Sequence, residues 1–125
     1  MIEQTSGRIV ATAFCAGKRH DFKLLVQSRT ALLRGTRCLA DSGYLGLMRH
    51  HANSQTPHKK SKLHPLTDEK KQANRQLSQE RFVVEHVIRS LKIFRILSER
   101  YRNRRKRFGL RFNLIAAIYN NELSD

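Results

Sequence analysis

Two carboxylates in a strongly basic chain are the residues best suited to chemistry. Asp41 follows the short, mostly apolar run 37–40 and precedes the glycine-containing stretch 42–46. An acid at the carboxyl end of a buried strand, before a glycine loop, stands where open α/β sheets bind ligands. The alternative is a turn aspartate that binds its own backbone. The residues by themselves leave both interpretations of Asp41 open.

Glu85 is the second acid, and three cations are spaced around it. Arg81, Glu85, Arg89 and Lys92 follow one another at intervals of four, four and three residues, so they share one helical face. One interpretation is a solvated face with helical ion pairs, each stabilising by about 0.2–0.5 kcal/mol. The other is a metal-binding carboxylate whose basic neighbours hold a phosphodiester. Spacing does not choose between them.

A long helix is predicted to position Glu85. Thr67 and the two acids after it mark a helix start, and no glycine or proline follows before Leu97. We therefore expect one long helix, or two helices joined near 77–78. Its apolar stripe, at helical spacing, is predicted to face a core. The stripe consists of Val84, Val87, Ile88 and Leu91.

Short β segments and a second helical region are predicted around these sites. Residues 7–15 are rich in β-forming types and predict a strand, and 37–40 predict a buried strand. Asp21 is placed to cap a short helix running towards Leu33. Residues 50–65 predict a loop that holds a short strand near 55–56. A final helix is predicted from the apolar residues Leu110, Leu114, Ile115, Ile118 and Tyr119.

The charge balance narrows the class of partner. The 125 residues include 25 Lys and Arg against 10 Asp and Glu, a formal net charge of +15. Such a small basic domain attracts polyanions, and nucleic acid is the first candidate. No apolar run approaches the about 20 residues that span a bilayer, and no secretory signal is evident at the N-terminus. We therefore expect a cytoplasmic protein with no membrane partner.

The cysteines and histidines suggest no strong metal motif. Cys15 and Cys38 lie in apolar surroundings without C-x-x-C spacing, which predicts two buried free thiols rather than a disulfide. Four histidines fall in the 50–65 loop, and solvated side chains that touch phosphate are favoured over a zinc site. They are His50, His51, His58 and His64.

Four ordered motifs resemble the C-terminal part of a bacterial insertion-sequence transposase of the DDE superfamily. Asp41 with its glycine loop resembles the second catalytic aspartate of that family. Glu85, with Arg81 before it and Lys92 after it, matches the spacing around the third acid. The resemblance covers nearly the whole chain. The motifs are residues 17–22, 41–46, 81–92 and 101–116.

Two departures from the family pattern affect the expected activity. Ser78 stands where the family has a tyrosine, and no residue matches the first catalytic aspartate. Asp21 lies in a context that matches a different family position. We therefore expect a C-terminal fragment with little or no strand transfer. A missing central strand also predicts marginal stability, or dependence on another polypeptide.

The resemblance implies a truncated RNase H-like α/β fold, with few short strands and long C-terminal helices. It implies one partial catalytic domain over residues 1–125 that cleaves and transfers DNA strands with Mg²⁺ or Mn²⁺. Asp41 and Glu85 would be its catalytic residues and metal ligands. Transposon ends and target DNA would be its partners, with a second copy or an N-terminal transposase polypeptide, near the bacterial nucleoid. The DNA-binding residues would be Arg81, Arg89, Lys92, Arg100, Arg102, Arg104, Arg105, Lys106 and Arg107.

The dense basic run at 100–107 also has a simpler interpretation as a solvated linker. With Tyr101 inside the run and Phe108 after it, phosphate contact is favoured. A rival function for the whole chain is a non-catalytic, basic nucleic-acid-binding module. A ribosomal-type RNA binder is a third hypothesis, which leaves Asp41 and Glu85 without a role.

Overall fold

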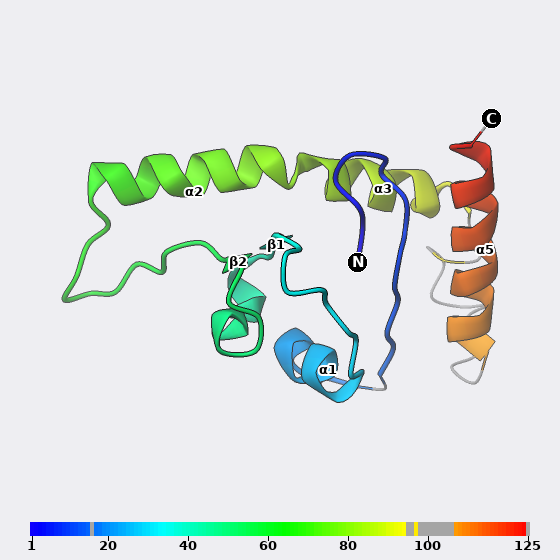
Figure 1. Ribbon diagram of the computed structural model, residues 1–125, viewed down its shortest axis with the longest axis horizontal. Coiled ribbons are helices and arrows are strands. Elements are labelled where there is room, and N and C mark those ends of the chain that lie inside the picture. Colours follow the sequence, from blue (N-terminus) through cyan, green and yellow to red (C-terminus); the bar gives the residue numbers. More distant parts are fainter. Residues whose placement is uncertain (16, 95–96, 98–106, 125) are drawn as a thin grey trace. The chain divides into compact units, whose positions relative to one another are not determined.

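Two compact units make up the chain in the computed structural model (Figure 1). The first unit comprises Met1–Gly17 and Phe82–Asp125, and the second comprises Lys18–Arg81. The structure describes residues 1–15, 17–94, 97 and 107–124. Short strands combined with helices of up to 15 residues agree with the predicted α/β class.

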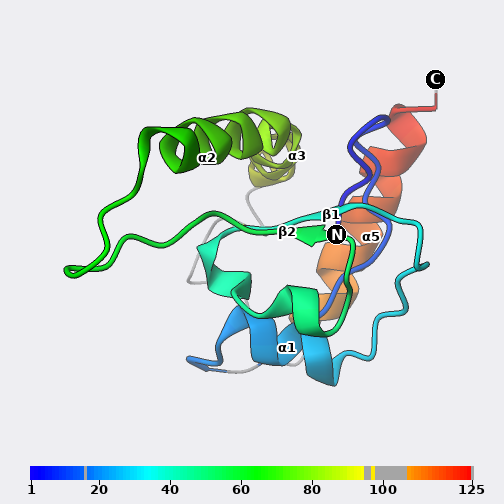
Figure 2. The same ribbon diagram turned by 60° about the vertical axis from the view of Figure 1, so that its left-hand side comes forward.

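The second unit contains a small parallel sheet, two turns of 3₁₀ helix and two α-helices. Strands β1 and β2 lie side by side, with Cys38 opposite Ser54 and Leu39 opposite Gln55 (Figure 2). Both strands were predicted, β1 within 37–40 and β2 displaced by one residue. The elements are α1 (Asp21–Gln27), β1 (Cys38–Leu39), η1 (Ser42–Tyr44), η2 (Leu47–Arg49), β2 (Ser54–Gln55) and α2 (Asp68–Glu80).

Helix α1 is shorter than predicted and begins differently. It ends at Gln27 rather than near Leu33, because Arg29 adopts the left-handed conformation with φ of 50°. His20 occupies the N-cap position without a side-chain cap, and Asp21 is already helical. The predicted capping role of Asp21 is therefore wrong, although its charge still favours the first turn.

Helix α2 starts where its sequence signal indicates. The hydroxyl of Thr67 accepts a hydrogen bond from the backbone N–H of Lys70 at 3.4 Å, and two acids follow in the first turn. The helix ends at Glu80, and a turn at Arg81 separates it from α3, which spans Phe82–Lys92. The region therefore forms two helices, joined later than the predicted 77–78.

The core of the first unit forms between α3 and α5. Val87 and Leu91 of α3 pack with Ile115 of α5, which spans Phe108–Glu122. The predicted apolar stripe of α3 is partly wrong, because Ile88 is 43% exposed. The residues packed around this core are Ile2, Ile9, Val83, Phe94, Leu97, Phe112 and Tyr119.

The N-terminal segment packs against α5 but is not the predicted strand. Within residues 7–15 the only β pairing is an isolated bridge between Ile9 and Ile2. Both backbone groups of Ile9 instead bond the side chain of Asn120, each at 2.8 Å. Thr12 bonds the side chain of Asn113 at 2.6 Å. Helix side chains thus satisfy backbone groups that a neighbouring strand would otherwise satisfy.

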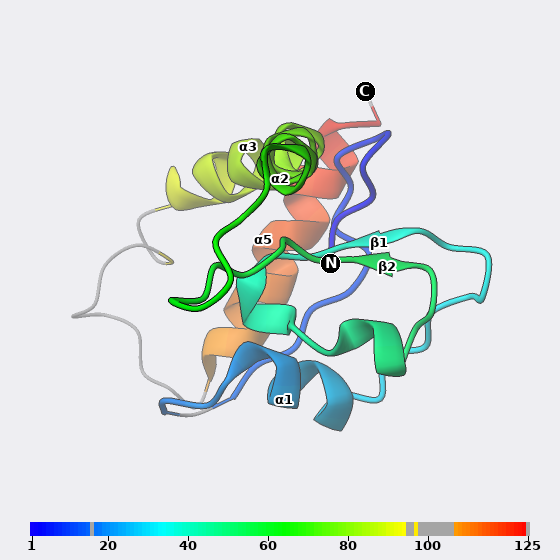
Figure 3. The same cartoon turned by 90° about the vertical axis from the view of Figure 1, so that its left-hand side faces the viewer.

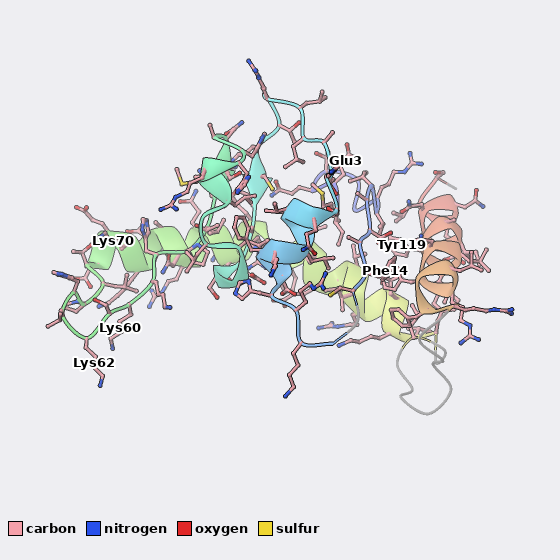
Figure 4. The ribbon with its side chains drawn as sticks, turned by 90° about the horizontal axis from the view of Figure 1, so that it is seen from below. Glu3, Phe14, Lys60, Lys62, Lys70 and Tyr119 are labelled. Carbon is pink, nitrogen blue, oxygen red and sulfur yellow. The ribbon has the colours of Figure 1, made fainter. Side chains whose placement is uncertain are left out.

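Aromatic rings attach the end of this segment to the start of α5. Phe14 meets Phe112 edge-on at 5.4 Å and Phe108 at 5.9 Å between ring centroids. A Cβ on Gly109 would lie 3.1 Å from the Phe14 ring, so a larger residue there would require the ring to shift by a few tenths of an ångström. Figure 4 shows Phe14 and Tyr119 between the N-terminal segment and α5. Phe108, expected to accompany the basic run in phosphate contact, is half-buried in this cluster.

The two cysteines are free, but neither is buried as predicted. Cys15 is exposed on the N-terminal segment, and Cys38 on β1 is half-buried. Burial raises the pKa of the Cys38 thiol above its ordinary value. Of the helices in the described part of the chain, none has the length and apolar character needed to cross a membrane.

Candidate functional site

Asp41 lies directly beyond the carboxyl end of the parallel sheet. Ala40, the residue before it, is buried and donates its N–H to the carbonyl of Gln55 at 2.9 Å. The Oδ1 atom of Asp41 accepts the N–H of Gly43 at 2.9 Å and so caps η1. The turn interpretation of Asp41 is therefore confirmed and the residue lies at the strand end as predicted, while ligand binding there stays a prediction. The turn holds one carboxylate oxygen in a defined direction.

The other oxygen of Asp41 faces an arginine. Arg81 Nη2 lies 3.5 Å from Asp41 Oδ2, which is long for a charge-assisted hydrogen bond. The two side chains are 28% and 47% exposed respectively. A pair this open to water contributes about 0–1 kcal/mol. Arg81 therefore compensates the charge of Asp41 at close range but is only weakly held there.

A second arginine fixes the end of α2 against the sheet. Arg37 forms an ion pair with Glu80 at 2.8 Å and also donates to the side chain of Gln55 on β2 at 2.6 Å. Because Glu80 is the last residue of α2, this contact helps to hold the following residue, Arg81, within reach of Asp41. Figure 3 shows the second unit with α2 viewed end-on. Asp41 and Arg81 thus meet within one unit although 40 residues separate them.

Asp21 and Tyr44 also lie beside Asp41, and neither was predicted to be part of the site. A Cβ on Gly43 would lie 3.0 Å from Asp41 Oδ1 and 3.7 Å from Asp21 Oδ2, so both carboxylates flank this glycine. Burial raises the pKa of Tyr44 above 10.0, and the charges of Asp21 and Asp41 raise it further, while Arg81 opposes them. The available signal was the motif at 17–22, which suggested a helix start and no place in the site.

Glu85 belongs to the first unit, where it is exposed on α3. Arg89 and Lys92, one and two turns further along, are exposed as well. Glu85 makes no ion pair with any described residue, so the predicted helical ion pairs are not formed among those residues. The convergence of Glu85 with Asp41 stays a prediction.

Most of the predicted basic DNA-binding run lies outside the described residues. Arg107 is described, and it is an exposed residue at the N-cap position of α5. The residues outside are Arg100, Arg102, Arg104, Arg105 and Lys106.

Of the four loop histidines, His51 differs from the prediction of solvated side chains. His51 is buried, and its ring Nε2 lies 2.5 Å from the carbonyl of Thr36. The ring of His50 meets Phe22 edge-on. His51 therefore departs from the prediction, whereas His50, His58 and His64 are exposed as predicted.

The described residues contain no group of three His, Cys, Asp or Glu side chains able to hold a metal ion. Asp41 itself has suitable chemistry, because a half-exposed carboxylate offers the hard oxygen atoms that Mg²⁺ and Mn²⁺ prefer. The second unit therefore offers part of a ligand set around Asp41, and further ligands would have to come from elsewhere.

Comparison with known proteins identifies the relatives of this chain. The family described as "Transposase DDE domain" matches residues 1–121. A probable transposase for insertion sequence element IS702 from Microchaete diplosiphon is 48% identical over 124 residues. The alignment covers 99% of this chain but 45% of that relative, so the chain spans less than half of the relative's length. No solved structure matches. Because the family match extends over nearly all of its residues, the chain belongs to the transposase DDE domain family.

Proposed function

We propose that this chain is part of a catalytic domain that cleaves and joins DNA strands during transposition, with Mg²⁺ or Mn²⁺ as cofactor. Asp41 and Glu85 are its metal ligands, within an RNase H-like fold. Arg81, Arg89, Lys92 and the basic run ending at Arg107 hold the DNA backbone. Divalent ions in such a site activate the attacking oxygen and stabilise the leaving oxygen of a phosphodiester.

One observation carries this proposal: the carboxylate of Asp41 stands half-exposed at the strand ends, with Arg81 facing it. The N–H of Gly43 orients one oxygen, so the acid is positioned before any ligand arrives. The family match, together with 48% sequence identity to a probable transposase, supports the proposed class of reaction.

Arg81 has two successive roles in this proposal. Without metal, its guanidinium balances the charge of Asp41 across 3.5 Å. The exposed Asp41–Arg81 pair is weak enough to separate at a cost of about 1 kcal/mol or less, and Asp41 would then be free to hold a divalent ion. Arg81 is then available for the phosphate next to the scissile bond, where an arginine binds through paired N–H donors.

The activity of this chain by itself is proposed to be low. No residue of the sequence matches the first catalytic aspartate of the family. With two acids instead of three, the residues present would hold divalent ions less firmly and would position the attacking oxygen less well. A second polypeptide that contains the remaining part of a transposase would supply this acid.

A metal-dependent nicking assay on supercoiled DNA, run together with the polypeptide that supplies the first acid, tests the function. D41N and E85Q keep the shape of each side chain but remove its charge, and each is expected to lower nicking by at least about 100-fold. This expectation follows because losing even an outer-shell partner of a metal ligand costs about 10–100-fold. E122Q, which alters an exposed acid on α5, is the matched control and should nick like the parent chain.

The same variants decide between nuclease and binding module. Unchanged nicking in both D41N and E85Q would refute the catalytic proposal. DNA binding without metal-dependent nicking in the parent chain, and binding unaffected by either variant, would favour the non-catalytic nucleic-acid-binding module. DNA retention by nitrocellulose filter, measured with and without Mg²⁺, separates these outcomes.

A further inference from the structure

A loop rich in lysine leads into α2, and the proposed catalytic site does not use it. We name residues 56–66, between β2 and α2, the lysine loop. Lys59, Lys60 and Lys62 of this loop are all exposed. The first half of α2 continues the positive charge with three more exposed cations. These are Lys70, Lys71 and Arg75.

Hydrogen bonds hold the lysine loop in a defined conformation along α2. The backbone N–H of His58 donates to the side chain of Asn74 at 2.8 Å, and Asn74 donates back to the carbonyl of His58 at 3.0 Å. At the outer end of the loop, the N–H of His64 donates to the hydroxyl of Ser61 at 3.0 Å. Figure 4 shows Lys60 and Lys62 on the loop and Lys70 at the adjoining end of α2. The lysines therefore lie on a loop whose conformation is held by hydrogen bonds.

The charge of this surface is scarcely neutralised. Residues 56–75 contain six Lys and Arg against two acids, Asp68 and Glu69. Lys71 pairs with Asp68 at 3.0 Å, and no other residue of this segment forms an ion pair with a described residue. A concentration of unpaired cations repels itself, so it favours a polyanion as partner.

The side chains of α2 identify the kind of polyanion. One face of the helix forms a shallow groove lined by three glutamines, two cations and one carboxylate. Amides and cations are donor types that contact phosphate and sugar. Residues 56–80 contain no Phe, Tyr or Trp on which single-stranded bases would stack. Leu63 is the one strongly exposed large aliphatic residue of the loop, too little apolar surface for insertion into a membrane. The lining residues are Asp68, Lys71, Gln72, Arg75, Gln76 and Gln79.

We propose that the lysine loop and the first half of α2 bind the phosphates of duplex DNA that flanks the cleavage site. This inference rests on the proposed function, because Asp41 and Arg81 lie at the far end of the same helix. The 13 residues of α2 extend over about 20 Å, since each residue rises about 1.5 Å. A duplex bound at Arg81 and followed along α2 thus reaches the lysine loop after about six base pairs, at about 3.4 Å per pair. The contact is independent of sequence.

The salt dependence of DNA affinity tests the proposal. The affinity of the full chain for a random-sequence duplex is measured by fluorescence anisotropy over a range of NaCl concentrations, in EDTA. K59Q/K60Q/K62Q is expected to weaken binding and to reduce the slope of log affinity against log salt by about 2–3. This size follows from a slope of about 0.9 for each phosphate contact. The triple substitution changes only exposed side chains, so the fold should persist.

A matched control separates a defined contact from general charge. K18Q/K23Q/R34Q removes the same charge from exposed positions elsewhere in the second unit. It should leave the slope within about 1 of the parent value. Equal slopes for the two triple variants, or a slope unchanged by the loop variant, would overturn the proposal. If the loop variant loses binding to phosphatidylserine vesicles but binds DNA like the parent chain, the proposal is overturned as well, in favour of a membrane surface.

The nicking assay keeps this proposal distinct from the proposed function. If D41N and E85Q nick normally while the loop variant loses salt-dependent affinity, the catalytic assignment fails and the loop remains a DNA contact. If both carboxylate variants lose nicking while the two triple variants bind alike, the catalytic assignment stands and the loop proposal fails.

Discussion

Asp41 shows how a single side chain combines a structural and a proposed chemical role. One oxygen is committed to the N–H of Gly43, and the other faces Arg81 across 3.5 Å. The backbone bond limits the directions in which the carboxylate can turn, while the exposed ion pair leaves the second oxygen accessible. This arrangement is consistent with a metal ligand that is oriented in advance.

Gly43 is expected to be a positioning residue for Asp41. In G43A the new Cβ would lie 3.0 Å from Asp41 Oδ1, so the carboxylate must rotate or the turn must shift. We expect metal-dependent nicking to fall by about 10–100-fold, as for residues that orient metal ligands. The midpoint concentration of Mn²⁺, measured in the same assay, should rise as well.

Gly35 offers a matched glycine in the same unit. A Cβ there meets nothing within 4 Å, so G35A is expected to nick like the parent chain. If G43A and G35A behave alike, Gly43 has no positioning role.

The raised pKa of Tyr44 leads us to expect that the free energy of unfolding falls at alkaline pH. Burial, reinforced by Asp21 and Asp41, raises the pKa of Tyr44 above 10.0, so the folded chain holds this proton more tightly than the unfolded chain. This contribution to stability is complete below about pH 10 and is lost as the pH rises through the folded-state pKa. Y44F should therefore flatten the fall of the free energy of unfolding above pH 10. Urea titrations of both chains at several pH values provide the measurement, and superimposable profiles would contradict it.

At the scale of elements, local signals located the helices better than they identified the packed faces. Thr67 marked the start of α2, and the final helix lies where its apolar spacing indicated. The face of α5 that packs, however, contains Ile115 and Ala116, while Leu110 and Leu114 are 72% and 62% exposed. A helix with apolar residues on most of its surface does not reveal which side will be covered.

Truncation of two adjacent residues of α5 should change the free energy of unfolding by very different amounts. Ile115 is 6% exposed and packs against Val87 and Leu91, so I115A is expected to lower the free energy of unfolding by about 2–5 kcal/mol. Leu114 is 62% exposed, so L114A should change it by about 0.5 kcal/mol or less. Chemical unfolding followed by far-UV circular dichroism measures both. A larger loss in L114A would mean that the other face of α5 is covered.

For the whole molecule, the net charge of +15 has opposite effects on folding and on binding. Self-repulsion among the cations opposes compaction, whereas attraction to phosphate favours association with DNA. Salt screens both interactions. The same excess of Lys and Arg that suits the proposed function therefore reduces the stability of the free chain.

Raising NaCl is expected to stabilise the chain while weakening its binding to DNA. Between about 50 and 200 mM, the urea midpoint should rise because repulsion is screened, and DNA affinity should fall steeply. K59Q/K60Q/K62Q has three charges fewer, so its midpoint should rise less. A midpoint that falls with NaCl in the parent chain would show that favourable ion pairs outweigh repulsion.

The sequence by itself determined the features that depend on neighbouring residues and on composition. These were the start of α2, the short segments that became β1 and β2, the position of Asp41 after β1, the basic character and the family resemblance. Caps, turns and helix starts form through hydrogen bonds over a few residues, such as Thr67 to Lys70, so their signals are local.

Only the tertiary structure decided which distant groups meet. Ile9 bonds Asn120 across 111 positions, which replaced a predicted strand, and Arg81 reaches Asp41 across 40. It likewise buried His51, exposed Ile88 and brought Asp21 and Tyr44 to the candidate site. The physical reason is that burial and long-range hydrogen bonds depend on which surfaces pack together, and many pairings satisfy the same apolar pattern and charge spacing.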